Sequence, residues 1–255
     1  ALFEAYEKFL AGSTHELLYR IPQSKLKIIK SWPFIYWISD EFREKFKKNS
    51  VKDLLKNCQG MSTTNNLKYL RFWWEIRPNF LEKYEEESKW FLHAKGGPYC
   101  KWHGNMWVVV NYENYGQEMK EEVKRRYPYL KGNTDYVVKN ESFYFKEGIT
   151  YSASGSKGTS FRYLQPNATF NVGGSSIFPA KYSNPIFYLA YFNSKLCSYI
   201  IDCLNPTVNT NPGDLDRLPF VVPSSIIEMA VEKRVKTILS IKTNLSSSFI
   251  SELEY

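Results

Sequence analysis

Short apolar runs alternate with Gly, Ser and Pro clusters around residues 144–179, and this alternation constrains the fold more than any other feature of the chain. The runs are rich in aromatic and β-branched residues, and they span 142–145, 149–151, 161–164, 169–172 and 176–178. Such runs between turn residues are typical of short strands joined by tight loops. We therefore predict an α+β fold, with twisted, mostly antiparallel sheets, flanking helices and a long C-terminal helix.

One loop in this stretch, residues 152–160, is rich in Gly and Ser and carries a single charge, that of Lys157. Arg162 follows on the next predicted strand, and no Asp or Glu occurs between Glu147 and Asp202. A hydroxyl-rich loop with cations and without carboxylates suits contact with a polyanion.

The composition favours a globular protein with a basic surface. The chain has 255 residues, of which 43% are hydrophobic and 17% aromatic, so it can form one large domain or two small ones. Its net charge of +8 is compatible with a nucleic acid or another anionic surface as partner.

The four cysteines form no CxxC pair, so we predict reduced, mostly buried thiols in a cytoplasmic protein. His93, Cys100 and His103 are the nearest approach to a metal-binding set, but they lack a fourth ligand at ordinary spacing, and we predict no metal. No signal peptide or membrane-spanning run is present, so we expect no membrane partner.

Periodicity and capping residues predict the order of the remaining elements. A strand that enters the Gly96–Gly97 turn indicates a hairpin whose tip presents Lys95 and Lys101, followed by a second strand at 106–111. An acidic cluster at 82–87 is typical of a solvated helix face. Helices are predicted at 2–10, 23–29, 40–47 after an N-capping Ser39, 116–126, 184–204 and 226–249, and a short strand or extended segment at 215–222.

The segment 60–76 (GMSTTNNLKYLRFWWEI) has two interpretations. In one, a capped amphipathic helix buries Trp73 and Trp74 in the core. In the other, the Thr and Asn side chains of residues 63–66 face a DNA groove, because Asn can read adenine and Thr can contact the thymine methyl group.

Catalytic motifs are missing from the chain. GSKGTS at 155–160 lacks the GK[ST] order of a phosphate loop, and Asn205-Pro206-Thr207-Val208 is not the Asn/Asp-Pro-Pro-aromatic motif of amino-methyltransferases. With three His residues there is little material for general-base chemistry. We predict that this chain by itself has no catalytic residues.

Several segments in a fixed order carry a resemblance to a known family. They are GMSTTNNLKYLRFWWE, AKGGPYCKWHGN, WVVVNYEN, YFKEGITYSASGSKGTSFRYL, FNVGGSSIF, LAYFNSKL and NPTVNTNPGDLDRLPFVVP. Together they resemble the C-terminal target-recognition (TaqI-like specificity) region of PglX-like adenine-specific DNA methyltransferases and fused restriction–modification enzymes. The resemblance covers roughly residues 31–223, and the LPFVVP-then-helix ending also looks like a module boundary in type I specificity subunits.

The resemblance implies a bacterial parent enzyme of a restriction–modification or phage-defence system, one that transfers a methyl group from S-adenosylmethionine to adenine N6. Its catalytic domain, with the NPPY motif, is expected before residue 1, and the resemblance to fused restriction–modification enzymes leaves open an endonuclease in the same parent. Residues 1–57 are then a helical connector, 58–222 the domain that reads double-stranded DNA, and 223–255 a C-terminal helix. Expected partners are DNA, the methyltransferase domain and other defence-system proteins; this segment itself needs no cofactor.

The family supplies no base-reading residues, so the candidate DNA contacts follow from side-chain chemistry. Each also has an ordinary explanation as surface charge, loop solvation or turn capping. The candidates are Thr63, Asn65, Asn66, Lys68, Arg71, Lys95, Lys101, Ser154, Ser156, Lys157, Thr159, Ser160, Arg162, Asn209 and Asn211.

Two alternatives to DNA recognition remain open. A protein-interaction module would use the aromatic surface and the terminal helix to bind a partner subunit or a DNA-mimicking inhibitor. An independent enzyme acting on nucleic acid is disfavoured by the absence of paired carboxylates or a metal set near the basic loops.

Overall fold

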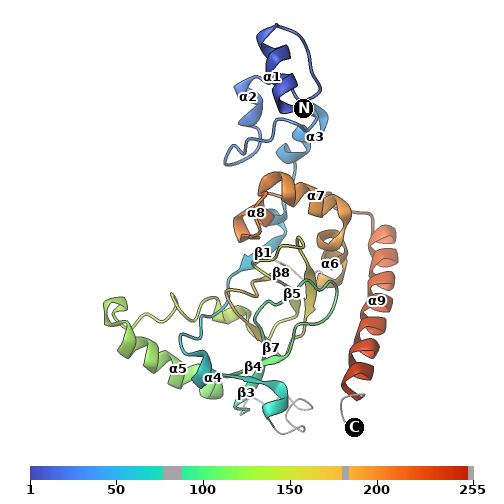
Figure 1. Ribbon diagram of the computed structural model, residues 1–255. Helices are drawn as coiled ribbons and strands as arrows, with labels where there is room; N and C mark the ends of the chain where they lie inside the picture. The colour runs from blue at the N-terminus through green and yellow to red at the C-terminus, as the bar shows by residue number, and fades with distance from the viewer. Residues whose placement is uncertain (77–87, 180–183, 252–255) are drawn as a thin grey trace.

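The computed structural model describes residues 1–76, 88–179 and 184–251, with side chains described through residue 246. It has an α+β architecture: two mostly antiparallel sheets, flanking helices and a long C-terminal helix (Figure 1). This confirms the predicted fold class. The acidic cluster predicted at 82–87 lies outside the described residues.

The first sheet has the strand order β1-β8-β5-β6 and is antiparallel throughout. Its strands are β1 (Leu55–Cys58), β8 (Ser176–Pro179), β5 (Gly148–Tyr151) and β6 (Phe161–Leu164). Trp102 forms a parallel bridge to Arg162 on β6, so the loop after β3 covers that edge of the sheet.

The second sheet has the order β2-β4-β3-β7. Its strands are β2 (Leu70–Phe72), β4 (Val108–Asn111), β3 (Trp90–Ala94) and β7 (Ala168–Phe170), and only β3 and β7 run parallel among these pairs. β3 and β4 form the predicted hairpin, but a loop at 95–107 joins them instead of a tight Gly-Gly turn.

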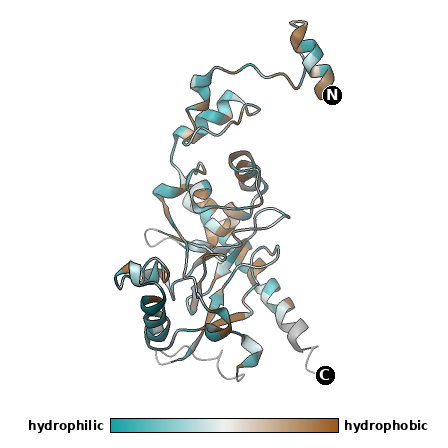
Figure 2. Ribbon diagram, turned by 60° about the vertical axis from the view of Figure 1, so that its left-hand side comes forward, coloured by the Kyte–Doolittle hydropathy of each residue, from teal (hydrophilic) through white to brown (hydrophobic). Residues whose placement is uncertain are grey.

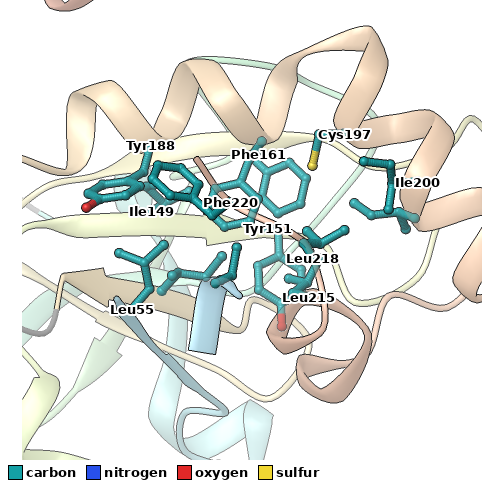
Figure 3. Packing of buried hydrophobic residues seen from close by; sticks show 14 of the residues in the cluster. Leu55, Ile149, Tyr151, Phe161, Tyr188, Cys197, Ile200, Leu215, Leu218 and Phe220 are labelled. Carbon is teal, nitrogen blue, oxygen red and sulfur yellow. The ribbon is translucent and has the colours of Figure 1, made fainter. Parts of the chain in front are cut away.

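One hydrophobic core lies between the first sheet and helices α6 (Pro185–Asn193) and α7 (Lys195–Leu204). Figure 3 shows Phe161 and Phe220 beneath this helical layer, with Leu215 and Leu218 below them. The rings of Phe161 and Phe192 stack with their centroids 4.8 Å apart. Full burial of one such ring contributes about 2–3 kcal/mol to stability.

The prediction of a single helix at 184–204 is wrong, because the helix is interrupted at Ser194. Ser194 is extended, and its Oγ accepts a hydrogen bond from the backbone N–H of Cys197, which makes it the N-cap of α7. The apolar pattern continues through Ser194 from one helix to the next, so this cap was not evident from the sequence. The short strand or extended segment predicted at 215–222 is wrong only at its first two residues, since α8 occupies Pro212–Asp216.

The N-terminal residues extend from the body as short helices: α1 (Leu2–Leu10), α2 (Gln23–Leu26) and α3 (Asp40–Glu44) (Figures 1 and 2). The predicted helix at 2–10 is confirmed, and so is the cap at Ser39, whose Oγ accepts from Phe42 N at 3.2 Å. Ile29, Ile35 and Val51 belong to the same buried cluster as the residues of the first sheet, and Phe42 of α3 contacts Tyr199 of the helical layer with ring centroids 6.2 Å apart. The N-terminal region is therefore joined to the body by buried apolar contacts.

The last helix, α9 (Ser225–Ser251), runs along α6 on one side of the molecule (Figure 1). Val235 is buried against the core, with Val231 and Leu239 partly buried beside it. Other apolar side chains of α9 remain exposed: Ile226, Ile227, Met229, Ile241 and Leu245. No helix in the described ranges is both long and apolar enough to span a bilayer.

Two close backbone approaches fix the junction between the sheets. At Gly174 a Cβ atom would lie 2.2 Å from the carbonyl oxygen of Ala94, and at Gly60 it would lie 1.9 Å from that of Phe170. Only glycine fits where two backbones come this close.

We therefore expect Gly174→Ala to lower the free energy of unfolding by about 1–3 kcal/mol or more, since the strand end must move to admit a methyl group. Gly213→Ala is the matched control, because its added Cβ has no neighbour within 4 Å. Urea denaturation of both variants measures the difference, and equal midpoints would contradict the proposed constraint.

Candidate nucleic-acid interface

Loops from four separate parts of the chain meet beside the first sheet. Ser152 Oγ donates to Gly97 O at 2.9 Å, and Ala153 N donates to Gly173 O at 3.0 Å. On the other side, Gly155 N donates to Val208 O at 2.9 Å, and Ser154 pairs with Asn209 in an antiparallel bridge. The predicted loop 152–160 is thus held between the loop after β3, the turn before β8 and the loop before α8.

A hollow of about 260 Å³ opens at this meeting point, and we call it the loop hollow. Its lining contains one lysine, no carboxylate, one proline, and otherwise hydroxyl-bearing residues and glycines. It consists of Gly97, Pro98, Tyr99, Ser152, Ser154, Gly155, Ser156, Lys157, Gly158 and Ser160. Exposed Lys157 and the exposed hydroxyls of Ser154 and Ser156 can donate to an anionic oxygen, whereas the hydroxyl of Ser152 already donates to Gly97 O. The arrangement can therefore hold a phosphate group.

Four of the sequence-predicted contacts line this hollow, namely Ser154, Ser156, Lys157 and Ser160. Thr159 is half-buried, and its Oγ1 has no hydrogen-bond partner within the described residues. Asn209 is exposed next to Ser154, and Asn211 caps α8 together with Asp214. The side-chain amide of Asn211 donates to Asp214 Oδ2 at 3.3 Å, so capping accounts for this residue.

Arg162 is not the surface cation that the sequence suggested, since it is only 1% exposed. Its guanidinium lies beneath the loop and donates to Ser152 Oγ at 3.1 Å, to Ser160 Oγ at 3.2 Å and to Cys100 O at 3.3 Å. Burial lowers the pKa of Arg162 to about 10. Arg162 can therefore act on a ligand only through the loop that it supports.

Lys101 likewise has a partner within the protein. Its Nζ donates at 3.0 Å to the carbonyl of Asn193, which is the last residue of α6. A cation at a helix C-terminus is favoured by the helix dipole. Lys101 and Lys95 therefore do not form the paired tip predicted for the hairpin, because Lys95 lines a different hollow.

The polar segment 63–71 has mostly local structural roles. Asn65 caps α4 (Asn66–Tyr69) by accepting from Lys68 N at 3.2 Å, and the hydroxyl of Thr63 donates to Asn66. Lys68 bridges Glu118 at 2.9 Å and Glu122 at 3.0 Å, which raise the pKa of the lysine above its usual value. Lys68 is consequently neutralised by helix α5 (Glu113–Arg126).

A second hollow, of about 600 Å³, lies where β2 and β4 meet the loop after β3, and we call it the aromatic hollow. It is lined by Asn66, Leu67, Leu70, Arg71, Phe72, Glu75, Lys95, Trp107 and Val108. Asn66, Arg71 and Lys95 were predicted as contacts from their chemistry, whereas the aromatic residues of this site were not. Arg71 donates to the carbonyls of Leu67 at 2.7 Å and Leu70 at 2.6 Å.

The interpretation that buries Trp73 and Trp74 in the core is wrong for Trp74, which is 57% exposed. The segment forms α4 and β2 and then a 3-10 turn at Trp73–Glu75, so a helical period does not apply. Trp74 instead stacks on Phe72, which is also exposed, with ring centroids 4.6 Å apart and planes 2° from parallel.

Beneath the turn before β8 lies His93, which is fully buried on β3. Nδ1 of His93 is 2.8 Å from Oγ1 of Thr169, and that hydroxyl donates to Leu92 O at 3.3 Å. Nδ1 must therefore carry the imidazole proton. Nε2 accepts from the amide of Asn171 at 3.3 Å, and Oδ1 of Asn171 accepts from Gly173 N at 3.0 Å.

His93, Cys100 and His103 do not gather into a metal site. His93 is enclosed by the network above, and Cys100 Sγ donates to the carbonyl of His103 at 3.0 Å. Within the residues that the structure describes, no group of three or more His, Cys, Asp or Glu side chains could hold a metal ion. All four cysteines are free thiols, and Cys58, Cys197 and Cys203 are buried.

No protein-family model matches the chain. Among curated proteins, the adenine-specific methyltransferase PglX of Lacticaseibacillus casei (strain Zhang) is 31% identical over 211 residues, which are 80% of this chain and 17% of that protein. The adenine-specific methyltransferase BrxX of Escherichia coli O9:H4 (strain HS) is 31% identical over 212 residues, which are 82% of this chain and 16% of that protein.

This chain is homologous to one segment of adenine-specific methyltransferases. It spans about a sixth of the length of PglX and BrxX. The predicted resemblance to PglX-like proteins is thereby confirmed, whereas the assignment to a TaqI-like recognition region remains a prediction.

The His93 network predicts a pH-dependent stability. Burial, with the charge of Lys95 in addition, lowers the pKa of His93 to about 3, compared with about 6.5 in an unfolded chain. The unfolded state therefore binds a proton first as the pH falls, and this site destabilises the fold by about 1.4 kcal/mol per pH unit below about 6.5. The fold goes on losing stability from this site until the pH reaches the pKa of His93 in the folded protein, about 3.

His93→Gln removes this titration while keeping a polar side chain. We expect its free energy of unfolding to fall less steeply between pH 6 and pH 5 than that of the unchanged chain, by about 1.4 kcal/mol per unit. Urea titrations at the two pH values measure the slopes. Parallel slopes would mean that His93 is protonated in the folded protein.

Proposed function

We propose that this chain is the DNA target-recognition region of an adenine-specific DNA methyltransferase related to PglX and BrxX. Its parent would belong to a bacterial phage-defence or restriction–modification system and act in the cytoplasm. The homology to both methyltransferases supports the parent activity. The chemistry of the two hollows supports DNA as the ligand of this segment.

The loop hollow is the observation on which the proposal chiefly rests. Lys157 projects from a loop of small hydroxylated residues, and no carboxylate lines the hollow to repel a phosphate. The buried guanidinium of Arg162 fixes that loop from below, through Ser152 and Ser160. A phosphate contact on an ordered loop fixes the register of a protein on the duplex, while neighbouring side chains read the bases.

Of the predicted contacts, Lys157, Ser154, Ser156, Ser160 and Asn209 fit phosphate or base contact best, because they are at the hollow or beside it. Lys95, Asn66 and Arg71 form a second set at the aromatic hollow. Six other predicted contacts bond to protein groups, and we assign them to supporting the structure around the hollows. They are Thr63, Asn65, Lys68, Lys101, Asn211 and Arg162. Thr159 lies in the loop 152–160 but does not line the loop hollow, so we assign it no contact of its own.

S-adenosylmethionine would bind elsewhere in the parent. Nucleotide cofactors of this kind bind at the carboxyl ends of parallel strands flanked by helices. The described sheets are antiparallel except at β3–β7, and the two hollows are formed by loops and by β2, β4 and α4. The described residues therefore do not fit that cofactor, and we assign no methyl-transfer step to them.

The predicted division assigns residues 1–57 to a connector, 58–222 to DNA recognition and 223–255 to a terminal helix. The first boundary falls inside β1, so the connector would be anchored in the sheet of the recognition domain. The methyltransferase domain of the same protein would be its neighbour.

A protein-interaction function is the second candidate, and exposed apolar side chains on two helices favour it. Leu2, Phe3 and Leu10 of α1 are exposed, as are Ile226, Ile241 and Leu245 of α9. Exposed apolar side chains on a helix suit contact with another domain or with a partner subunit. These faces are separate from both hollows, so the two functions are compatible.

Duplex binding as a function of salt tests the proposal. Lys157→Gln should weaken binding to a mixed-sequence duplex and reduce the slope of log K against log salt by about 1, because one phosphate contact is lost. Lys131→Gln, at an exposed turn after α5, is the charge-matched control and should leave the slope unchanged. Fluorescence anisotropy with labelled duplex measures both.

Binding that is absent or insensitive to salt, in this chain and in the intact parent, would favour the protein-interaction function. Sequencing of N6-methylated adenines in cells that carry the intact gene supplies the second readout. Under our proposal, Lys157→Gln lowers methylation at the recognised sites, whereas Lys131→Gln does not.

A further inference from the structure

The aromatic hollow has features that phosphate binding does not explain. Leu70, Trp107 and Val108 contribute apolar side chains to its lining, and the exposed ring of Phe72, which also lines it, stacks on the ring of Trp74. Its volume of about 600 Å³ is within the range of small-ligand sites. A flat aromatic ring is the chemical group that such a surface binds best, because ring faces stack on one another.

A hydrogen-bond donor, Lys95, and an acceptor, Glu75, also line the aromatic hollow. The ammonium of Lys95 has no hydrogen bond or ion pair to any group in the described parts of the chain, although it is partly buried. Burial lowers the pKa of this lysine below its usual value. Glu75 supplies a carboxylate, one oxygen of which accepts from Phe72 N at 2.6 Å. A ring that carries both acceptors and donors, as a nucleobase does, would use both residues.

The aromatic hollow adjoins the loop hollow. Lys95 lines the first and Gly97 the second, so only one residue separates the two linings along the chain. Two successive Cα–Cα steps span at most about 7.6 Å. The ring of Trp107 packs against Gly97, where an added Cβ would lie 2.9 Å from Trp107 Cζ2. The base and the phosphate of one DNA strand can therefore occupy the two hollows together.

We propose that the aromatic hollow receives one unstacked base of the DNA strand whose phosphate lies in the loop hollow. This inference rests on the proposed function and specifies the ligand of the same surface. Phe72 and Trp107, which line the hollow, provide the stacking surface, and Trp74 supports it by stacking on Phe72. Lys95 donates to a base acceptor, and Glu75 accepts from an exocyclic amine. The protein would then hold a base outside the helix at a site separate from any methylating centre.

The test compares a fully paired duplex with a duplex of the same sequence that has one unpaired nucleotide. The intact chain should bind the second duplex more tightly, because the base is already unstacked. Phe72→Ala, Trp74→Ala and Lys95→Gln should each reduce that preference. The phenylalanine change should do so by about 5-fold or more, because Phe72 lines the hollow and loss of one stacking partner costs that much. Binding to the paired duplex should change less.

Tyr129→Ala is the matched aromatic control, because Tyr129 is exposed on the turn after α5 and lines neither hollow. Urea midpoints check that every variant is folded. A preference that is the same in Phe72→Ala, Trp74→Ala, Lys95→Gln and the unchanged chain would overturn the inference, while salt-dependent binding of the paired duplex would still support the proposed function.

Photochemical cross-linking supplies a readout independent of affinity. With 5-iododeoxyuridine as the unpaired nucleotide, we expect the cross-link on Phe72, Trp74 or Trp107, located by mass spectrometry of the digested protein. Cross-links confined to other peptides would refute the site. Loss of association with the methyltransferase domain in Trp74→Ala, without any change in DNA preference, would instead assign this surface to a protein contact and overturn the inference.

Discussion

Two stretches of backbone meet at Gly96 and Gly174 with no room for a side chain, and both candidate hollows depend on this contact. A Cβ atom at Gly96 would lie 2.5 Å from the carbonyl oxygen of Gly173, and one at Gly174 would lie 2.2 Å from that of Ala94. The end of β3 is thereby fixed against the turn that leads to β8. Gly173 O also accepts from Ala153 N, so the same turn orients the loop 152–160.

Buried polar groups reinforce this junction at some cost in desolvation. His93 stays neutral between Thr169 and Asn171, and Asn171 in turn holds the turn through Gly173 N. Arg162 brings a charge under the loop, where its guanidinium donates to four acceptors on three residues while its Nε has no partner within the described residues. Apolar side chains would fill such sites with a smaller desolvation penalty, but they could not hold polar loops in one conformation. We interpret both residues as positioning groups for the candidate interface.

The surface charge that remains for a ligand is small and local. Lys68 is neutralised by Glu118 and Glu122, and Lys101 bonds the end of α6, so neither adds much to the attraction of an anion. Lys157 and Lys95 stand at adjoining hollows, one lined with hydroxyls and one with aromatic rings. This difference in lining is the physical basis for assigning a phosphate to one and a base to the other.

The α+β class, the strands β5 to β8, several helix starts such as Ser39, and the acid-free loop around Lys157 could all be predicted from local patterns, because strand period, capping and composition are local properties. Which polar residues reach the surface could not be predicted in this way. Arg162 and Thr63 are buried and Trp74 is exposed, contrary to what their chemistry suggested, since burial depends on packing partners distant in sequence. The adjacency of the two hollows arises in the same way, from backbone contacts between residues 94–97 and 152–174, which no local pattern specifies.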